Sequence, residues 1–277
     1  MARIGKINKL TIKRTRNDGA LLDGGESGDI LLPTREVPEK CQAGDEIEVF
    51  VYTDQEDHLR ATTRKPHATV GEFAPLRVKT ITSSGAFLDW GLEKDLFVPK
   101  SEQRQRMQEG KSCIVHLFLD EKTNRIIASA KIDKFLDLQP PEYTEGQEVD
   151  LLIAEQTDLG YKAIVNQCHG GMIYKNEVFQ RLAVGRRVKG FIKKIREDLK
   201  IDLSLQKTGG RAVDDIAQAV LATLQAHGGR IAVSDKSPPE DIYALFGVSK
   251  KNFKKAIGAL YKKRLIIIDT NDIRLAG

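Results

Sequence analysis

The chain has 277 residues, of which 40% are hydrophobic and 30% are charged, so its length allows about two to four domains with cores of their own. It lacks the roughly 20 consecutive apolar residues of a membrane span and the N-terminal apolar run of a signal peptide. Its three cysteines, Cys41, Cys113 and Cys168, form neither a disulfide framework nor a zinc motif, and Cys168-His169 would be only half of a metal site. We therefore expect a reduced, soluble, cytoplasmic protein with no metal and no cofactor.

The net charge of +5 is unevenly distributed along the chain. Residues 1–145 contain 22 basic and 24 acidic residues, whereas residues 146–277 contain 22 basic and 15 acidic residues. An anionic partner should therefore bind mainly to the C-terminal half. An imbalance of this size also occurs in proteins without such a partner, so the charge alone does not show that an anionic partner exists. The sequence motifs are needed to distinguish the two cases.

Residues 1–66 are predicted to form a small closed barrel. Asn17-Asp18-Gly19 is a strong turn signal, and short alternating segments lie on both sides of it. The five expected strands are Leu10–Ile12, Ala20–Leu22, Gly28–Pro33, Glu46–Tyr52 and Leu59–Thr63. Five short strands in this length are typical of a barrel, and Lys65-Pro66-His67 is expected to be a hinge.

The same pattern recurs in residues 67–145, which include a linker, and in residues 146–207. The repeats begin near Gly5, Gly71 and Gly146, and this spacing is longer than solenoid periods, so we predict a tandem of independent barrels. The third repeat ends in the hairpin Gly185–Ser204. In its first strand Val188 and Ile192 alternate with Lys189, Phe191 and Lys193, so one face can enter a core while the other presents cations beside an aromatic ring.

Residues 208–277 are predicted to form a separate helical domain. Apolar residues at helical spacing indicate a first helix that ends at His227-Gly228-Gly229. Prolines at Ser237-Pro238-Pro239 start a second helix, and Ser249 is the expected cap of a third. The buried stripe of the third helix is expected to contain Phe253, Ile257, Leu260 and Tyr261. With a closing hairpin from Leu265 to Leu275, this order is typical of a winged helix-turn-helix.

These motifs carry a family resemblance. The three repeats resemble S1-type RNA-binding domains, which are five-stranded barrels of the OB class, through Ser84–Leu88, Gly185–Val188 and Lys200–Ser204. Three such barrels followed by a winged helix resemble the CvfB/YitL family of bacterial RNA-binding proteins over essentially the whole chain. The resemblance implies a mostly β protein with an α+β C-terminal domain. It also implies single-stranded RNA binding, mainly by the third barrel and the winged helix, and a role in regulating gene expression after transcription.

The S1 pattern places stacking and basic residues on particular strands. Phe87 matches the aromatic of the second strand, Tyr174 that of the third, and Asp120 with Arg125 flanks the last turn of the second repeat. The first repeat has Leu21 in place of the aromatic, so we expect it to be structural and the second repeat to be intermediate. Phe97 and Phe118, on apolar strands, are expected to be core residues.

The expected RNA-binding residues are aromatic rings that stack on bases and cations that follow the backbone. For Phe191 and the two tyrosines, packing in the barrel core is an equally good interpretation. Apart from Phe87 and Arg125, the predicted set is Tyr161, Lys162, Tyr174, Lys175, Phe191, Lys193, Lys194, Lys200, Lys250, Lys251, Lys254 and Lys255. The last four share a helix face and would contact phosphates, although a solvated face explains them too.

Two other functions remain open. A winged helix usually reads duplex DNA, so the chain could be a DNA-binding transcription regulator, although its third helix offers no obvious base-reading residue beyond Asn252. It could also be a scaffold that contacts the ribosome or a polymerase, which would predict no salt-sensitive affinity for free RNA. We predict no enzymatic activity, because the sequence contains no P-loop, nucleophile motif or metal-binding set.

Overall fold

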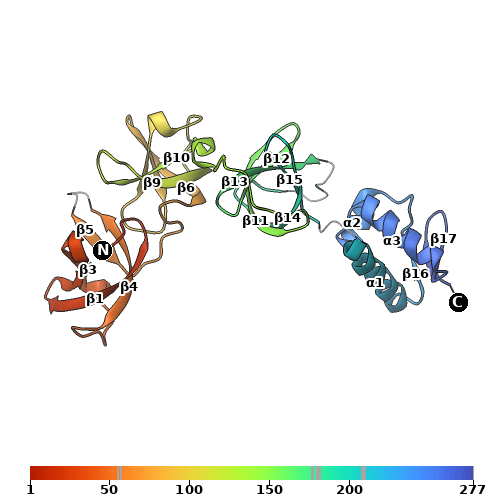
Figure 1. The fold of residues 1–277 in the computed structure, drawn as a ribbon, viewed down its shortest axis with the longest axis horizontal. Helices are drawn as coiled ribbons and strands as arrows, with labels where there is room; N and C mark the ends of the chain where they lie inside the picture. Colours follow the sequence, from red (N-terminus) through yellow and green to blue (C-terminus); the bar gives the residue numbers. More distant parts are fainter. Residues whose placement is uncertain (55, 57, 176–177, 179–181, 207–209, 277) are drawn as a thin grey trace. The chain divides into compact units, whose positions relative to one another are not determined.

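A computed structural model of the chain describes residues 1–54, 56, 58–175, 178, 182–206 and 210–276. It contains three closed five-stranded barrels and, near the C-terminus, three helices with a small sheet (Figure 1). By contacts, the chain divides into two compact units, residues 1–136 and 137–277. The expected fold class, three barrels followed by a winged helix, is confirmed. None of the helices within the described ranges is long and apolar enough to cross a membrane.

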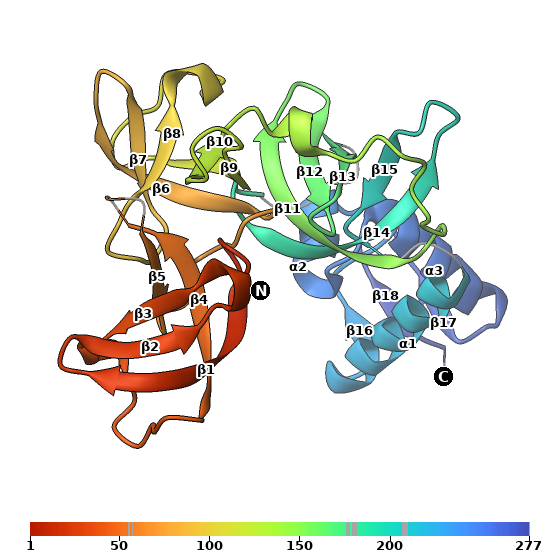
Figure 2. The ribbon, with the colours of Figure 1, turned by 60° about the vertical axis from the view of Figure 1, so that its left-hand side comes forward.

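The first barrel closes in the order β1-β2-β3-β5-β4. Figure 2 shows β1, β2 and β3 side by side, and β3 pairs with β5 in parallel. Alternation places every second side chain inside, so Ile12, Leu22 and Ile30 are buried in one core. The strands are β1 (Ile7–Arg16), β2 (Gly19–Asp23), β3 (Asp29–Pro33), β4 (Glu46–Thr53) and β5 (Leu59–Thr62), with short 3₁₀ turns at Gly25–Ser27 and Thr34–Glu36.

The second barrel repeats this topology in the order β10-β8-β7-β6-β9. Its core contains Leu76, Leu88 and Leu117. The strands are β6 (Phe73–Ile81), β7 (Gly85–Asp89), β8 (Leu96–Pro99), β9 (Ser112–Leu119) and β10 (Ile126–Ser129), with 3₁₀ turns at Lys100–Glu102 and Ile132–Phe135.

The first two barrels share part of their packing within residues 1–136. Phe50, in the middle of the first barrel's β4, belongs to the core cluster of the second barrel. Its ring meets Trp90 edge-on, with centroids 5.6 Å apart. Lys94 Nζ donates to the carbonyl oxygens of Thr53 and Asp54 at 2.8 and 2.9 Å. The second barrel is therefore completed by an aromatic side chain of the first.

The third barrel closes in the order β11-β12-β13-β15-β14 around a core that includes Leu151, Ile173 and Leu203. Its strands are β11 (Glu148–Gln156), β12 (Gly160–Val165), β13 (His169–Tyr174), β14 (Arg187–Ile195) and β15 (Ile201–Ser204).

One glycine marks the start of the second strand in every barrel. A Cβ on Gly19, Gly85 or Gly160 would lie between 2.0 and 2.3 Å from a carbonyl oxygen of the third strand. No side chain fits at that distance, so these positions require glycine.

The C-terminal domain is a winged helix. It consists of α1 (Gly210–Ala226), β16 (Arg230–Ile231), α2 (Pro239–Phe246), α3 (Lys250–Lys262), β17 (Ile266–Ile268) and β18 (Ile273–Leu275). Its sheet has the order β16-β18-β17. The sequence predicted the hairpin but missed β16, because two residues carry too little pattern to identify a strand. Arg230 on β16 donates to Asp272 Oδ2 at 2.6 and 3.1 Å, which ties this strand to the hairpin.

Candidate nucleic-acid interface

The α3 helix presents a basic face opposite its buried stripe. Ser249 caps it, since its hydroxyl accepts a hydrogen bond from Asn252 N at 3.2 Å, as expected. Phe253, Ile257 and Leu260 enter the domain core. The remaining face carries Lys250, Lys251, Lys254 and Lys255. The cap and the apolar stripe therefore fix which way these lysines point.

The four lysines differ in what holds them. Lys254 Nζ lies 3.4 Å from Asp235, and Lys250 Nζ donates to the Lys236 carbonyl at 3.2 Å. Lys251 and Lys255, four residues apart, are exposed and have no ion pair among the described residues. Of these four lysines, Lys251 and Lys255 are the two that a phosphate could reach without displacing a carboxylate or a carbonyl within the described residues.

Tyr261 lies outside the core, contrary to the sequence expectation. It is 57% exposed, whereas Leu260 beside it is 3% exposed. Leu260 and Tyr261 follow Ile257 by three and four residues, and either spacing fits the buried stripe of a helix. In the folded domain Leu260 occupies the core and Tyr261 does not. Because Tyr261 follows Lys254 by seven residues, close to two helical turns, its ring lies on the basic face. The sequence missed it as a candidate stacking residue.

On the third barrel, two predicted neighbours on β12 point in opposite directions. Tyr161 is 9% exposed and packs in the barrel core, so the expectation that its ring stacks on a base is wrong. Lys162 lies on the outer face and pairs with Glu155 at 3.3 Å. Adjacent strand residues face opposite sides, so only one of the two could face a ligand.

Tyr174, at the end of β13, is held by an arginine that the sequence did not single out. Arg196 donates to the Tyr174 hydroxyl at 2.5 Å, and its Cζ lies 5.6 Å from the ring centroid. Arg196 also donates to Asp202 Oδ1 at 2.9 Å, and this hydrogen bond raises the pKa of the guanidinium above its usual value. Asp202 and the Tyr174 hydroxyl therefore fix the position of Arg196. The result is a stack of an aromatic ring and a cation, Tyr174 and Arg196, on the barrel's outer surface.

The other predicted residues of this barrel lie on its surface to different degrees. Phe191 and Lys193 are half-buried on β14, whereas Lys175 and Lys194 are exposed. Lys194 is paired in register with Asp202, the partner of Arg196. Lys200 Nζ is 2.7 Å from Asp198. The barrel therefore brings Lys194 close to the Tyr174–Arg196 stack, while Lys200 pairs within its own turn.

On the second barrel, Phe87 forms an aromatic pair with Phe97. The two residues are opposite each other on β7 and β8, with ring centroids 5.0 Å apart and planes tilted by 38°. Both are half-buried, so the expectation that Phe97 is a core residue is wrong. Its neighbours Leu96 and Val98 enter the core instead, and alternation turns Phe97 outward. The predicted Arg125, near the last turn, is exposed.

Phe118 is also half-buried rather than a core residue. Its ring packs against Phe135 with centroids 5.1 Å apart.

Two of the three cysteines have a thiol pKa that is raised above its usual value. Burial raises the pKa of the Cys113 thiol to about 11, so it stays protonated at neutral pH. Burial, followed by the charge of Asp137, also raises the pKa of Cys168. One ligand atom from each of Asp137, Cys168 and His169 lies within 4.8 Å of the others. This group could hold a metal ion, but it is one ligand short of a structural zinc site.

The fold and these surfaces define a class of protein. S1 barrels belong to the OB class, which binds single strands, and winged helices belong to the helix-turn-helix class, so the chain is built from nucleic-acid-binding domains. The S1 domain model matches residues 4–64 and 70–131. The model of the CvfB-like winged helix domain matches residues 218–275.

The chain belongs to the CvfB/YitL family. It is 30% identical to YitL of Bacillus subtilis over 275 residues, which cover 94% of this chain and 89% of the relative. It is 27% identical to conserved virulence factor B of Staphylococcus epidermidis over 288 residues, which cover 98% of this chain and 94% of that protein. A crystal structure of a multidomain protein with nucleic acid binding domains from Streptococcus pneumoniae is 25% identical, covers 98% of both chains and has a TM-score of 0.43.

Proposed function

We propose that the protein binds single-stranded RNA and regulates gene expression after transcription, without enzymatic activity. The observation that carries this proposal is the Tyr174–Arg196 stack on the third barrel, with Lys194 nearby. Base stacking on such groups contributes about 1–3 kcal/mol per base and needs unpaired bases, whose faces a duplex hides.

The basic face of α3 supports the same proposal. Lys251 and Lys255 are exposed, and Tyr261 is an exposed ring on the same helix. Cations of this kind contact phosphates and give affinity that depends strongly on salt, with little sequence selectivity. Together the third barrel and the winged helix would form the main contact surface for the strand.

A DNA-binding transcription regulator is the second candidate. Asn252, the residue on α3 best suited to reading adenine, donates from Nδ2 to Gln206 Oε1 at 3.3 Å. Reading a base would require this contact to break, which argues against α3 as a base-reading helix. A protein-binding scaffold, for example on the ribosome, is the third candidate.

Fluorescence anisotropy separates the three candidates. The full chain is titrated against a labelled oligouridine and a labelled DNA duplex over a series of salt concentrations. The proposal predicts tighter, salt-dependent binding to the RNA. Tighter binding to the duplex would favour the transcription regulator, and an absence of binding to either would leave the scaffold.

A further inference from the structure

Three side chains of types that bind metal ions meet beside the turn between β12 and β13. They are Asp137, Cys168 and His169, and one ligand atom of each lies within 4.8 Å of the others. No other group of three histidine, cysteine or acidic side chains meets in this way within the described residues. Cys168 and His169 are neighbours in the chain, whereas Asp137 comes from the segment that precedes the third barrel.

The backbone holds this group together. Asn166 and Gln167 have φ angles of 48° and 60°, and Cys168 N donates to the Val165 carbonyl oxygen at 2.9 Å. These angles define a tight two-residue hairpin turn, which places Cys168 directly before β13. Asp137 N donates to the Cys168 carbonyl oxygen at 2.9 Å, so the segment that enters the barrel is held against this turn.

His169 has a ring nitrogen without a partner. Its Nδ1 atom lies 3.1 Å from the Tyr143 hydroxyl, and Tyr143 packs against the core of the third barrel, so the orientation of the imidazole is fixed. The other nitrogen, Nε2, is buried and has no hydrogen-bond partner among the described residues. Buried polar atoms are normally paired, and the neutral imidazole is the commonest metal ligand in proteins. The unpaired nitrogen therefore points to a ligand that the polypeptide does not supply.

The oxygen and sulfur atoms lie close to the spacing that zinc requires. Asp137 Oδ1 accepts a hydrogen bond from Gln139 N at 2.8 Å, and its Oδ2 lies 3.9 Å from Cys168 Sγ. A sulfur and an oxygen on one tetrahedral zinc ion are about 3.6 Å apart. Asp137 has no ion pair within the described part of the chain, so its charge favours a cation. Zinc accepts sulfur, nitrogen and oxygen ligands, whereas Mg²⁺ and Ca²⁺ prefer oxygen alone.

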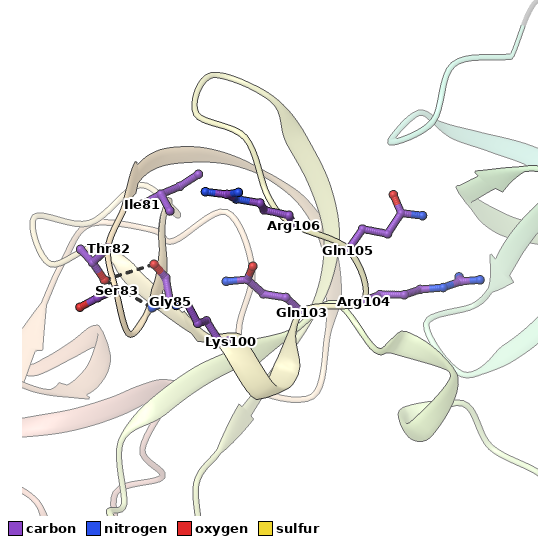
Figure 3. Close-up of a pocket in the computed structure, with 9 residues that line it drawn as sticks. All are labelled: Ile81, Thr82, Ser83, Gly85, Lys100, Gln103, Arg104, Gln105 and Arg106. Atoms are coloured by element: carbon purple, nitrogen blue, oxygen red, sulfur yellow. Dashed lines mark hydrogen bonds between the residues drawn. The ribbon is translucent and has the colours of Figure 1, made fainter.

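The groove on the second barrel does not offer such ligands. Figure 3 shows the side chains that line it, among them Thr82, Gln103 and Arg106. None of the lining residues drawn there is a histidine, a cysteine, an aspartate or a glutamate. A zinc ion that binds to described residues of this chain should therefore bind beside the β12–β13 turn.

We propose that Asp137, Cys168 and His169 bind one zinc ion, with a water molecule as the fourth ligand. The ion would join the segment that enters the third barrel to the β12–β13 turn of the same barrel. Zinc binds the thiolate, so the proton of the Cys168 thiol is released to solvent when the metal binds. The inference does not depend on RNA binding and goes beyond the proposed function.

The test uses the full chain, which is freed of metal with a chelator and titrated with Co²⁺ as a coloured substitute for zinc. The inference predicts a thiolate-to-cobalt charge-transfer band that saturates at a single ion per chain and disappears when Zn²⁺ is added. C168S should lose the band, whereas the control C41S, which removes another half-buried free thiol, should keep it. D137N should bind Co²⁺ at least about tenfold more weakly, because even the loss of an outer-shell partner costs about 10–100-fold.

The absorption band separates the outcomes. A wild-type chain without the band would overturn the inference, and so would C168S if it kept the band or C41S if it lost the band as completely. Far-UV circular dichroism checks that the variants are folded. Anisotropy with labelled RNA tests the proposed function separately, so failure of the metal site would leave that proposal standing.

Discussion

The shared packing of the first two barrels predicts that they unfold together. Phe50 is 0% exposed, and replacing a buried phenylalanine by alanine costs about 3–5 kcal/mol. Trp90, which Phe50 contacts, is the only tryptophan in the chain and lies in the other barrel. With a urea dependence of about 2 kcal/mol per molar, F50A should lower the midpoint of the Trp90 fluorescence transition by roughly 1.5–2.5 M.

A matched variant controls for general destabilisation. Phe253, in the winged helix, is also 0% exposed, and F253A should leave the Trp90 midpoint unchanged while it destabilises its own domain. Far-UV circular dichroism follows the whole chain in parallel. If F50A shifts only the circular dichroism and the Trp90 midpoint stays in place, the barrels unfold independently and the reasoning fails.

Four further predictions follow from single features. Y174A should weaken RNA binding by about 1–3 kcal/mol, whereas Y174F keeps the ring and should bind nearly as well; equal losses in anisotropy titrations would refute stacking. K251A/K255A should lower the salt slope by about 1.4, and an unchanged slope would mean that α3 does not contact phosphates. The hydrogen bond from Arg274 lowers the pKa of Asp272, so its stabilisation is present at neutral pH and is lost as the pH falls below about 4; the difference in Tm between wild type and D272N should shrink over that range, and a constant difference would contradict it. G160A should unfold at lower temperature because its Cβ would lie 2.0 Å from the Ile173 carbonyl oxygen, and a wild-type Tm would contradict this.

Alternation and turn signals were enough to predict the strands of the three barrels. They work because a strand with one buried face must alternate, and the turns between strands need glycine, asparagine or aspartate. The same logic predicted the Ser249 cap and α3, whose stripe is long and regular. Short elements without a pattern, such as β16, gave no signal.

Side-chain direction was harder to predict for the aromatic residues. Tyr161 and Lys162 are neighbours on β12, so one points into the barrel and the other points out. A tyrosine is stable both inside a core and at a surface, so the alternation alone does not show which way Tyr161 points. Tyr261 and Phe97 were placed in the core for the same reason and lie outside it. Arg196 was missed because its partners, Tyr174 and Asp202, lie on other strands, and single-sequence patterns contain no information about pairs across a barrel.

Equivalent positions on the second and third strands carry different side chains in the three barrels, which indicates different roles for the barrels. The equivalent pair across the second and third strands is Leu21–Leu31 in the first barrel, where Leu21 is buried, and Phe87–Phe97 in the second, where both rings are half-buried. In the third it is Lys162–Met172, with the ring supplied two positions further along the chain. Aliphatic side chains offer a base neither a π-face nor a charge. We therefore infer that the first barrel mainly supports the second, through Phe50.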